Sequence, residues 1–402
     1  MEKNKIKIKQ TQWDLTPLFE GDEDPKIADK RKVVEGEGYR FINKWRDRSD
    51  YLESPAILEE ALDEYEKWQR FWGSDGDEGY YFWLRTSQDE NDPVIKAKFN
   101  KIIEFGKNLQ NDILFFELQL AKVPGQKQKE FLGYEGLEKY RHFLGMLFKN
   151  AKYQLSEAEE KILNLKHQPA QYNWMKMVSG FLSKEERGVI LEDGRKDVKN
   201  FSEISSLMNS QNKACRDSDG DAFNDILQKH AEVAEAEMNS ILLDKKINDG
   251  LRGFSRPDFS RHLSDDIDSE VVDVLLESVT QNFDIAQRYY GLKARLMSVP
   301  KLKYHERNVP YGDAEKEYSF EDATNLVSEV FKNLDGEFAD ILKMFLDGGH
   351  IDVYPRKGKS DGAFCAHNLI SQPVYILLNH TGKLRDVLTF AHELGHGINN
   401  EL

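Results

Sequence analysis

Cysteine is scarce in this sequence of 402 residues, and long apolar runs are missing. The two cysteines, Cys215 and Cys365, lie far apart, and a disulfide framework would need more of them. The apolar run at 374–378 is far shorter than the ~18 residues of a membrane span. The N-terminus is basic but has no apolar core, so it does not predict a signal peptide. These absences predict a soluble, cytoplasmic protein that does not bind membranes.

An excess of basic charge is also missing. The chain has 56 Lys and Arg against 71 Asp and Glu, a net charge of -15. Nucleic-acid-binding proteins usually carry a basic patch, so this balance argues against a nucleic-acid partner. Internal repeats and low-complexity segments are absent as well. The length allows a large core and favours two or more domains.

Most of the chain shows apolar side chains at helical spacing, separated by capping and turn residues. We interpret these aromatic-rich stripes as core packing. The patterns predict helices at 56–72, from Asp92-Pro93 towards Pro124-Gly125, after a capping box of Ser156 and Glu159, between about Ser202 and Met297, and from Ser319 to about Gly348-Gly349.

Two segments interrupt the helices. Val189–Leu191, a two-residue turn at Asp193-Gly194 and Asp197-Val198 predict a hairpin, where we place a soft domain boundary. This gives an N-terminal helical domain at 1–198 and a second domain at 199–402. Between residues 350 and 380, two short apolar runs, 363–365 and 374–378, predict two strands. The fold class is therefore mostly α, with a small β-sheet directly before a last helix from about Lys383.

The last helix carries the chemistry, in the sequence HELGH at 392–396. Residues four apart lie on one face of a helix, so His392 and His396 can direct two imidazoles at one metal ion. Glu393 projects nearby without coordinating, as a general base for a zinc-bound water needs to. Zinc lowers the pKa of that water to ~7 and polarises the carbonyl under attack. The pattern predicts a zinc-dependent hydrolase.

The surrounding residues predict one buried side for this helix. At about 100° per residue, its apolar side chains fall in an arc of ~120°, with His392 and His396 beyond one edge. Gly395 falls inside the arc, which suggests that another backbone packs closely there. The alternative is a surface helix with two solvated histidines. The apolar residues of the arc are Leu384, Val387, Leu388, Ala391, Leu394, Ile398 and Leu402.

Several motifs along the chain resemble the oligoendopeptidase F branch of the thimet-oligopeptidase-like (M3) metallopeptidases. The resemblance covers nearly the whole chain and is far more specific than HExxH alone. Its motifs are Trp13–Phe19, Leu251–Phe254, Arg261–Leu263, Arg288–Lys293, Tyr354–Lys359, Gly362–Cys365 and Thr389–His396.

This resemblance implies a helical ellipsoid with a deep channel that admits short, unstructured peptides. It implies His392 and His396 as ligands of one Zn2+ and Glu393 as the general base of a zinc metalloendopeptidase. It also implies that Gly362, Ala363 and Phe364 belong to a cleft-edge strand that binds the peptide substrate. An exposed strand edge offers unpaired amides and carbonyls to an extended chain. The two domains would be an oligopeptidase F N-terminal-like domain and the M3 catalytic domain.

The sequence departs from the family pattern after the zinc-binding motif. The family's third zinc ligand is a glutamate on a later helix, and its transition-state-stabilising tyrosine and histidine lie further on. The present sequence ends at Leu402, six residues after His396, so we expect a third ligand outside it and an incomplete catalytic domain. Asn399 stands where many relatives have a histidine.

Three hypotheses follow from this departure. In the first, the sequence is an incomplete record of an active zinc oligopeptidase. In the second, the 402 residues form a peptide-binding or scaffold module without catalysis. In the third, a complete but unusual enzyme takes its third ligand from His367, His380 or a neighbouring subunit. The sequence does not indicate the oligomeric state, the cleavage-site preference or the physiological substrate.

Overall fold

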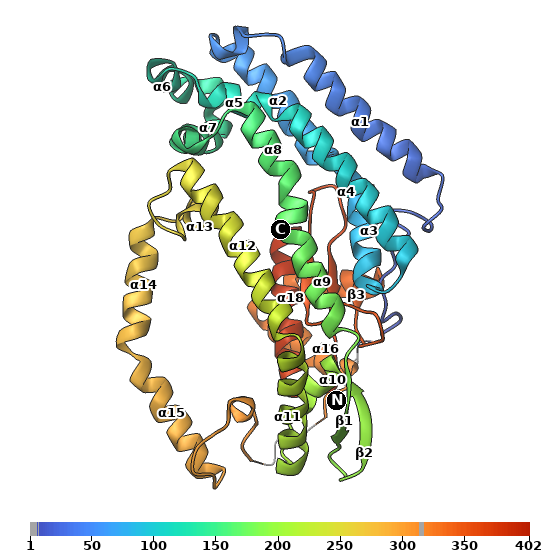
Figure 1. Ribbon diagram of the computed structural model, residues 1–402. Coiled ribbons are helices and arrows are strands. Elements are labelled where there is room, and N and C mark those ends of the chain that lie inside the picture. The colour runs from blue at the N-terminus through green and yellow to red at the C-terminus, as the bar shows by residue number, and fades with distance from the viewer. Residues whose placement is uncertain (1–5, 7, 313–316) are drawn as a thin grey trace. The chain divides into compact units, whose positions relative to one another are not determined.

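The computed structural model of the chain describes residues 6, 8–312 and 317–402. The chain divides into two compact units, residues 1–144 with 315–402 and residues 145–314. The predicted mostly α-helical fold with a small sheet is confirmed (Figure 1). The domain assignment at 1–198 and 199–402, the ellipsoid and the channel stay predictions.

The N-terminal part of the first unit is helical. The helix predicted at 56–72 is α2, and Asp92 caps α4 by accepting hydrogen bonds from the amides of Val94 and Ile95. The helix predicted to run on from there is divided into two, α4 and α5, which meet at Leu114, although the backbone of Leu114 is itself helical (φ -54°, ψ -26°). The helices are α1 (Lys26–Trp45), α2 (Pro55–Phe71), α3 (Gly76–Gln88), α4 (Pro93–Ile113), α5 (Phe115–Ala121) and α6 (Gly125–Gly133), with the short 3-10 helices η1 (Asp50–Leu52) and η2 (Glu135–Tyr140). The next helix, α7 (Arg141–Asn150), begins in this unit, and its residues from Gly145 on belong to the second.

The C-terminal part of this unit contains three helices and a three-stranded sheet. Ser319 caps the first helix as predicted, but the single helix predicted up to Gly348 is two. Asp335 is extended between them (φ -154°, ψ 139°), and its side chain caps the second helix. The elements are α16 (Phe320–Leu334), α17 (Gly336–Asp347), α18 (Leu384–Glu401), β3 (Ile351–Asp352), β4 (Phe364–Ala366) and β5 (Tyr375–Leu377).

The sheet has the strand order β3-β5-β4, so β4 is an edge strand. The predicted strands at 363–365 and 374–378 correspond to β4 and β5, which are antiparallel with Cys365 opposite Ile376. β3, which pairs in parallel with β5, was not predicted. Two residues are too short a segment for an alternating pattern to be recognised.

Both faces of the sheet are buried. Ile376 of β5 belongs to a core that includes Phe345, Phe390 and Leu394 from α17 and α18. Tyr375, on the opposite face, belongs to a core built by the N-terminal helices. Successive side chains of a strand point to opposite faces, so one strand joins both cores. The sheet therefore fixes α18 relative to α3 and α4.

The motif that begins at Trp13 has a structural role at this sheet. The indole Nε1 of Trp13 donates to the carbonyl of Ile376 (2.9 Å), and the Asp14 amide donates to the Gly349 carbonyl (2.8 Å). The Tyr375 hydroxyl donates to the carbonyl of Asp14 (2.7 Å). The segment at Trp13 and Asp14 is thus hydrogen-bonded to β5.

The second unit is helical with one hairpin. The capping box of Ser156 and Glu159 is present as predicted, and so is the helical region between about 202 and 297. The elements are α8 (Glu157–His167), the π-helical η4 (Gln168–Tyr172), α9 (Asn173–Leu182), β1 (Glu186–Ile190), β2 (Lys196–Asn200), α10 (Phe201–Leu207), α11 (Lys213–Lys229), α12 (Ala231–Arg252), α13 (Phe259–Ser264), α14 (Ser269–Gln281) and α15 (Phe283–Leu296), with the 3-10 helices η3 (Ala151–Tyr153) and η5 (Tyr304–Glu306).

The predicted hairpin is confirmed, but its turn differs. The Leu191 amide donates to the Arg195 carbonyl (2.8 Å), so three residues, not two, lie between the paired positions. Gly194 has a φ of 81°, the left-handed conformation that such three-residue loops place before the second strand.

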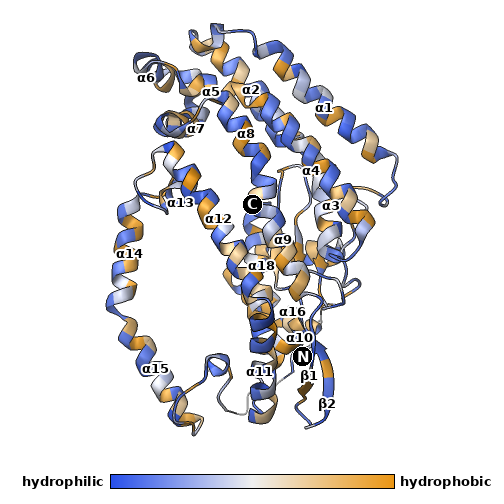
Figure 2. Cartoon of the chain, in the orientation of Figure 1, coloured by the Kyte–Doolittle hydropathy of each residue, from blue (hydrophilic) through white to orange (hydrophobic). Residues whose placement is uncertain are grey.

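Two helices of the second unit leave apolar faces exposed. α14 has no buried residue, and Leu275 and Val279 are 60% and 50% exposed. Figure 2 shows apolar residues along α14 and α15, which continues the chain from α14. Within the part of the second unit that the structure describes, these faces are not covered.

Both cysteines, Cys215 and Cys365, are free thiols. Among the described residues, no helix combines the length and the apolar content that crossing a lipid bilayer requires.

Candidate functional site

The start of α18 is fixed by one carboxylate. Oδ2 of Asp386 accepts hydrogen bonds from the amides of Thr381 (2.7 Å) and Lys383 (3.0 Å) and from the Thr381 hydroxyl (2.9 Å). An acidic group in the first turn also complements the helix dipole. The helix that was predicted from about Lys383 is confirmed, and these hydrogen bonds fix the residue at which it begins.

The two predicted metal ligands face each other on this helix. The Nε2 atoms of His392 and His396 are 3.2 Å apart, and their ring planes are at 89°. Both side chains are exposed. The helix therefore presents two imidazole nitrogens at one point on its accessible side.

This geometry fits a zinc ion. With Zn–N distances of about 2.0–2.1 Å and tetrahedral angles, two imidazole nitrogens on one ion lie about 3.3 Å apart. The observed separation of 3.2 Å is close to that value. Among the described residues, no further His, Cys, Asp or Glu completes a three-ligand group with this pair.

Glu393 lies on a different side of α18 from the two histidines. It is 9% exposed, and its charge acts on the thiol of Cys365 in β4. Burial is the main cause that raises the pKa of Cys365, to about 11, and the negative charge of Glu393 adds to it. The amide of Asn400 also donates to Cys365 Sγ (3.7 Å). The helix of the HELGH sequence and the edge strand are therefore direct neighbours.

The buried face of α18 differs from the predicted arc. Val387, Leu394 and Ile398 are buried as predicted, but Leu388 and Leu384 are exposed. The observed buried face is rotated about the helix axis from the predicted arc, because the sheet and α17 cover the side that carries Phe390 and Glu393. Phe390 is fully buried at the centre of that face.

The close approach expected at Gly395 occurs at Gly397. A Cβ on Gly395 would meet no atom within 4 Å, so that prediction is wrong. A Cβ on Gly397 would lie 2.6 Å from Phe345 and 3.4 Å from Ile376. Gly397 thus lets α18 contact α17 and β5 closely.

The predicted peptide-binding segment leads into β4. Gly362 has a φ of 76°, and its carbonyl accepts a hydrogen bond from the Asn379 amide (2.9 Å). Phe364 packs against Trp83 of α3, with ring centroids 5.4 Å apart. Ala363 is half-buried against the core under α18. One edge of β4 is not paired with another strand of the sheet.

A buried ion cluster next to this segment was not predicted. The side chains of Lys359 and Asp352 are both 0% exposed, with Nζ 2.7 Å from Oδ1. Arg356 forms a second ion pair with Asp352 (2.6 Å). The cluster fixes the loop between β3 and β4. Arg356 and Lys359 fall in the Tyr354–Lys359 motif of the family resemblance, but Asp352 precedes it, so only the basic residues gave a signal.

The other histidines of this part of the chain have different surroundings. His350 is stacked between Phe345 and Tyr375. His380 is buried, and its Nε2 lies 2.8 Å from the Tyr318 carbonyl. His367 is exposed. None of the three forms a three-ligand group with His392 and His396 among the residues that are described.

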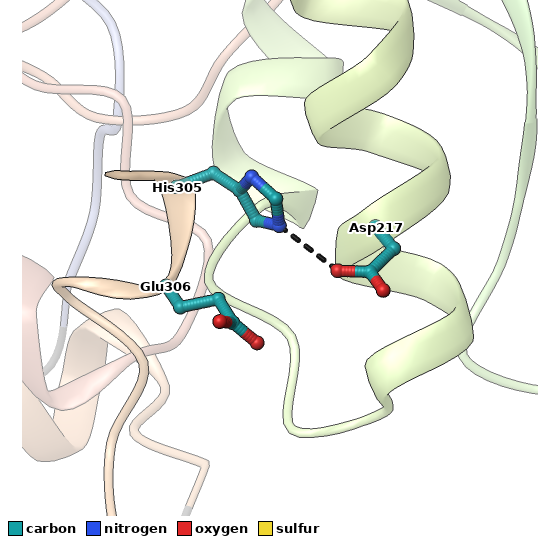
Figure 3. Close-up of side chains that lie close together, drawn as sticks. All are labelled: Asp217, His305 and Glu306. Atoms are coloured by element: carbon teal, nitrogen blue, oxygen red, sulfur yellow. Dashed lines mark hydrogen bonds and ion pairs between the residues drawn. The ribbon is translucent and has the colours of Figure 1, made fainter. Parts of the chain in front are cut away.

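A separate group of possible ligands lies in the second unit. Ligand atoms of Asp217, His305 and Glu306 lie within 4.8 Å of one another, and His305 faces Asp217 (Figure 3). Positive side chains already neutralise the carboxylates. Lys213 lies 2.6 Å from Asp217, and Arg216 lies 3.0 Å from Glu306. We interpret this group as an ion-pair network that joins α11 to η5.

Comparison with curated proteins places this chain beside oligoendopeptidases. An oligoendopeptidase F homologue from Borreliella burgdorferi is 24% identical over 397 residues, which are 96% of this chain and 64% of the relative. The oligopeptidase PepF of Bacillus subtilis is 20% identical, over 99% of this chain and 58% of the relative. The chain thus spans somewhat less than two thirds of the length of these relatives.

Solved structures show the same fold. PZ peptidase A has a TM-score of 0.67 at 16% identity, over 91% of this chain and 62% of that one. Oligoendopeptidase F from Enterococcus faecium has a TM-score of 0.64 at 15% identity, over 81% of this chain and 66% of that one. Residues 119–177 match the oligopeptidase F family, and residues 206–402, which include the HELGH helix, match peptidase family M3. The chain belongs to peptidase family M3, in its oligoendopeptidase F branch.

Proposed function

We propose that this chain carries the metal-binding helix and the substrate strand of a zinc-dependent endopeptidase for short, unstructured peptides. The main support is the 3.2 Å separation of the His392 and His396 Nε2 atoms, on a helix that lies beside an edge strand. Membership of a peptidase family supports peptides as substrates.

Each residue of the motif has a distinct role in this proposal. His392 and His396 would hold the zinc ion through Nε2. When bound, zinc polarises the peptide carbonyl and makes hydroxide available near neutral pH. Glu393 accepts the proton that the attacking water gives up. Its place between α18 and β4 suits this role, because the packing there restricts its carboxylate to one side of the helix.

The peptide is held by main-chain pairing. The free edge of β4, with the preceding Gly362 and Ala363, offers amides and carbonyls to an extended chain. Phe364 packs against Trp83, which helps to hold the strand in place for a peptide. Pairing of this kind requires an extended substrate segment, which suits short or unfolded chains.

Two measurements on the complete enzyme test the proposal: zinc affinity by titration and cleavage of an internally quenched peptide. We expect His392→Ala to weaken zinc binding, with exposed His367→Ala as the matched control. Glu393→Gln should keep the zinc affinity and lower the cleavage rate by about 10²–10⁴-fold, the contribution typical of a general base. Cleavage at the wild-type rate by Glu393→Gln would exclude the role given to this residue.

The alternative of a non-catalytic binding or scaffold module has no structural observation in its favour. Likewise, the cytoplasmic location stays a prediction, and no finding points to a nucleic-acid or membrane partner.

A further inference from the structure

A cavity of about 460 Å³ lies among the helices of the first unit, away from the HELGH sequence. Its wall combines the turn between α2 and α3, one side of α4 and two residues that follow β4, Asn368 and Leu369. Trp72 provides an aromatic surface, and Gln69 and Gln110 provide amides. The lining is thus polar on most sides, which suits a ligand with charged or hydrogen-bonding groups.

The cavity is tied to the carboxyl end of β4. The Tyr80 hydroxyl of α3 donates to the carbonyl of Ala366, the last residue of the strand (3.0 Å). The Gln372 amide donates to Asp77 of α3 (3.1 Å). At the α2–α3 turn, Leu369 lies 3.5 Å from where a Cβ of Gly73 would stand. A peptide paired with β4 would therefore have one end beside this cavity.

Asp75 is the acidic group of the cavity. It stands at the N-cap of α3 but makes no side-chain capping hydrogen bond. Its side chain instead lies against the backbone of α3 and α4, because a Cβ on Gly79 would lie 2.3 Å from the Cβ of Asp75 and a Cβ on Gly106 would collide with its Oδ1. Two glycines thus make room for one carboxylate at the wall of a cavity.

This carboxylate lacks a close cationic partner among the described residues. Lys107 is the charged side chain that acts on it, but its Nζ points to the Gln110 amide oxygen (3.5 Å). Burial disfavours the charged form of Asp75 and raises its pKa, and the charge of Lys107 compensates for this only in part. A cationic ligand group would supply that compensation.

The charge of the cavity also selects a peptide direction. In an antiparallel pairing with β4, the amino end of the peptide lies beside the carboxyl end of the strand. In a parallel pairing, the peptide's carboxylate would lie there, next to Asp75. Repulsion between the two carboxylates disfavours the second arrangement.

We propose that this cavity is the subsite for the free amino terminus of the peptide substrate, with Asp75 as the partner of its ammonium group. The inference rests on the proposed peptidase function and on pairing of the peptide with β4. Asp75 is then a specificity-determining residue, because it favours peptides with a free amino terminus.

The test is a binding experiment with the full chain carrying Glu393→Gln, so that cleavage does not interfere. Two versions of one short peptide are titrated, with a free and with an acetylated amino terminus. We expect the free form to bind about ten-fold more tightly or better, as a charge-assisted hydrogen bond to a half-buried carboxylate allows. Asp75→Asn should abolish this preference, and Glu104→Gln, an exposed carboxylate of α4, should preserve it.

A second variant provides a readout if Asp75→Asn does not fold. Lys107→Met removes the competing cation from a half-buried position, so it should tighten binding of the free peptide. Equal binding of both peptides, or a preference that survives Asp75→Asn, would overturn the subsite and leave the peptidase proposal standing. Binding of neither peptide would refute the peptide-binding function itself. A preference for the free amino terminus that Asp75→Asn abolishes, together with no hydrolysis by the protein with native Glu393, would support the subsite alone.

Discussion

Nζ of Lys359 lies 2.7 Å from Oδ1 of Asp352, and neither side chain is accessible to solvent. The same ammonium donates to the carbonyls of Tyr354 (2.9 Å) and Leu378, the residue after β5. One buried lysine thus joins the end of β3, the end of β5 and the loop that leads to β4. Because β4 is the proposed substrate strand, this ion pair helps to hold the site in place.

Lys359→Met should destabilise the chain by about 3 kcal/mol, because it leaves Asp352 buried with one charged partner fewer. Arg356, which remains paired with Asp352, keeps the loss from being larger. Urea unfolding measures the change in the free energy of unfolding. Lys357→Met is the matched control, since Lys357 is exposed in the same loop. Equal stabilities of the two variants would show that the buried pair contributes nothing.

The two glycines of the HELGHG segment should respond in opposite ways to alanine. Gly397→Ala places a methyl group 2.6 Å from Phe345 in a packed core, which should cost about 1–3 kcal/mol. Gly395→Ala meets no atom within 4 Å, so it should gain up to about 1 kcal/mol of helix propensity. Thermal unfolding of the metal-free chain compares them. A stabilised Gly397→Ala would refute the close packing between α18 and α17.

These glycines also show how far the sequence predicts the helix. Helical periodicity predicted the existence of α18 and the shared face of His392 and His396, because both depend only on local spacing. It did not predict which flank is buried, because that depends on where β5 and α17 lie. Phe390 and Glu393 are buried for this long-range reason, and Gly397, not Gly395, became the contact point.

The same limit applies to the other features that were missed. β3 has two residues, one of which, Asp352, is polar and buried only because Lys359 pairs with it. The cavity at Asp75 joins residues that lie nearly 300 positions apart in the sequence. No local pattern of a single sequence contains such contacts, whereas the hairpin and the capping box of Ser156 were visible because their partners are near neighbours.

Asp219 of α11 should make the stability of the chain fall as pH rises. It is fully buried, Oδ1 has no hydrogen-bond partner, and burial raises the pKa of this carboxyl from 3.8 to about 6. The folded state therefore prefers the protonated form. Its contribution to stability is complete below about pH 4 and is lost as pH rises through about 6.

Asp219→Asn should remove this loss, which is of the order of 3 kcal/mol for a shift of about two pKa units. Urea unfolding at pH 4.5 and pH 7.5 measures the difference between the two conditions. Asp221→Asn, at an exposed position of the same helix, should leave the wild-type pH dependence intact. An unchanged pH dependence in Asp219→Asn would rule out this carboxyl as its source.

Substitutions of His305 and of His392 should affect different properties: the first the stability of the chain, the second its zinc affinity. At His305, Nε2 lies 3.0 Å from Asp217, whose other oxygen is paired with Lys213. A Cβ on Gly220 would lie 2.6 Å from this ring, so the imidazole fills a tight space against α11. His305→Ala should therefore lower the free energy of unfolding by about 1–3 kcal/mol and leave the zinc affinity unchanged.

His392→Ala, at an exposed position, should instead weaken zinc binding and leave the free energy of unfolding unchanged. Zinc titration and urea unfolding of both variants give four values. A loss of zinc affinity in His305→Ala would mean that a metal ion competes with Lys213 for Asp217 and that the ion-pair interpretation is wrong.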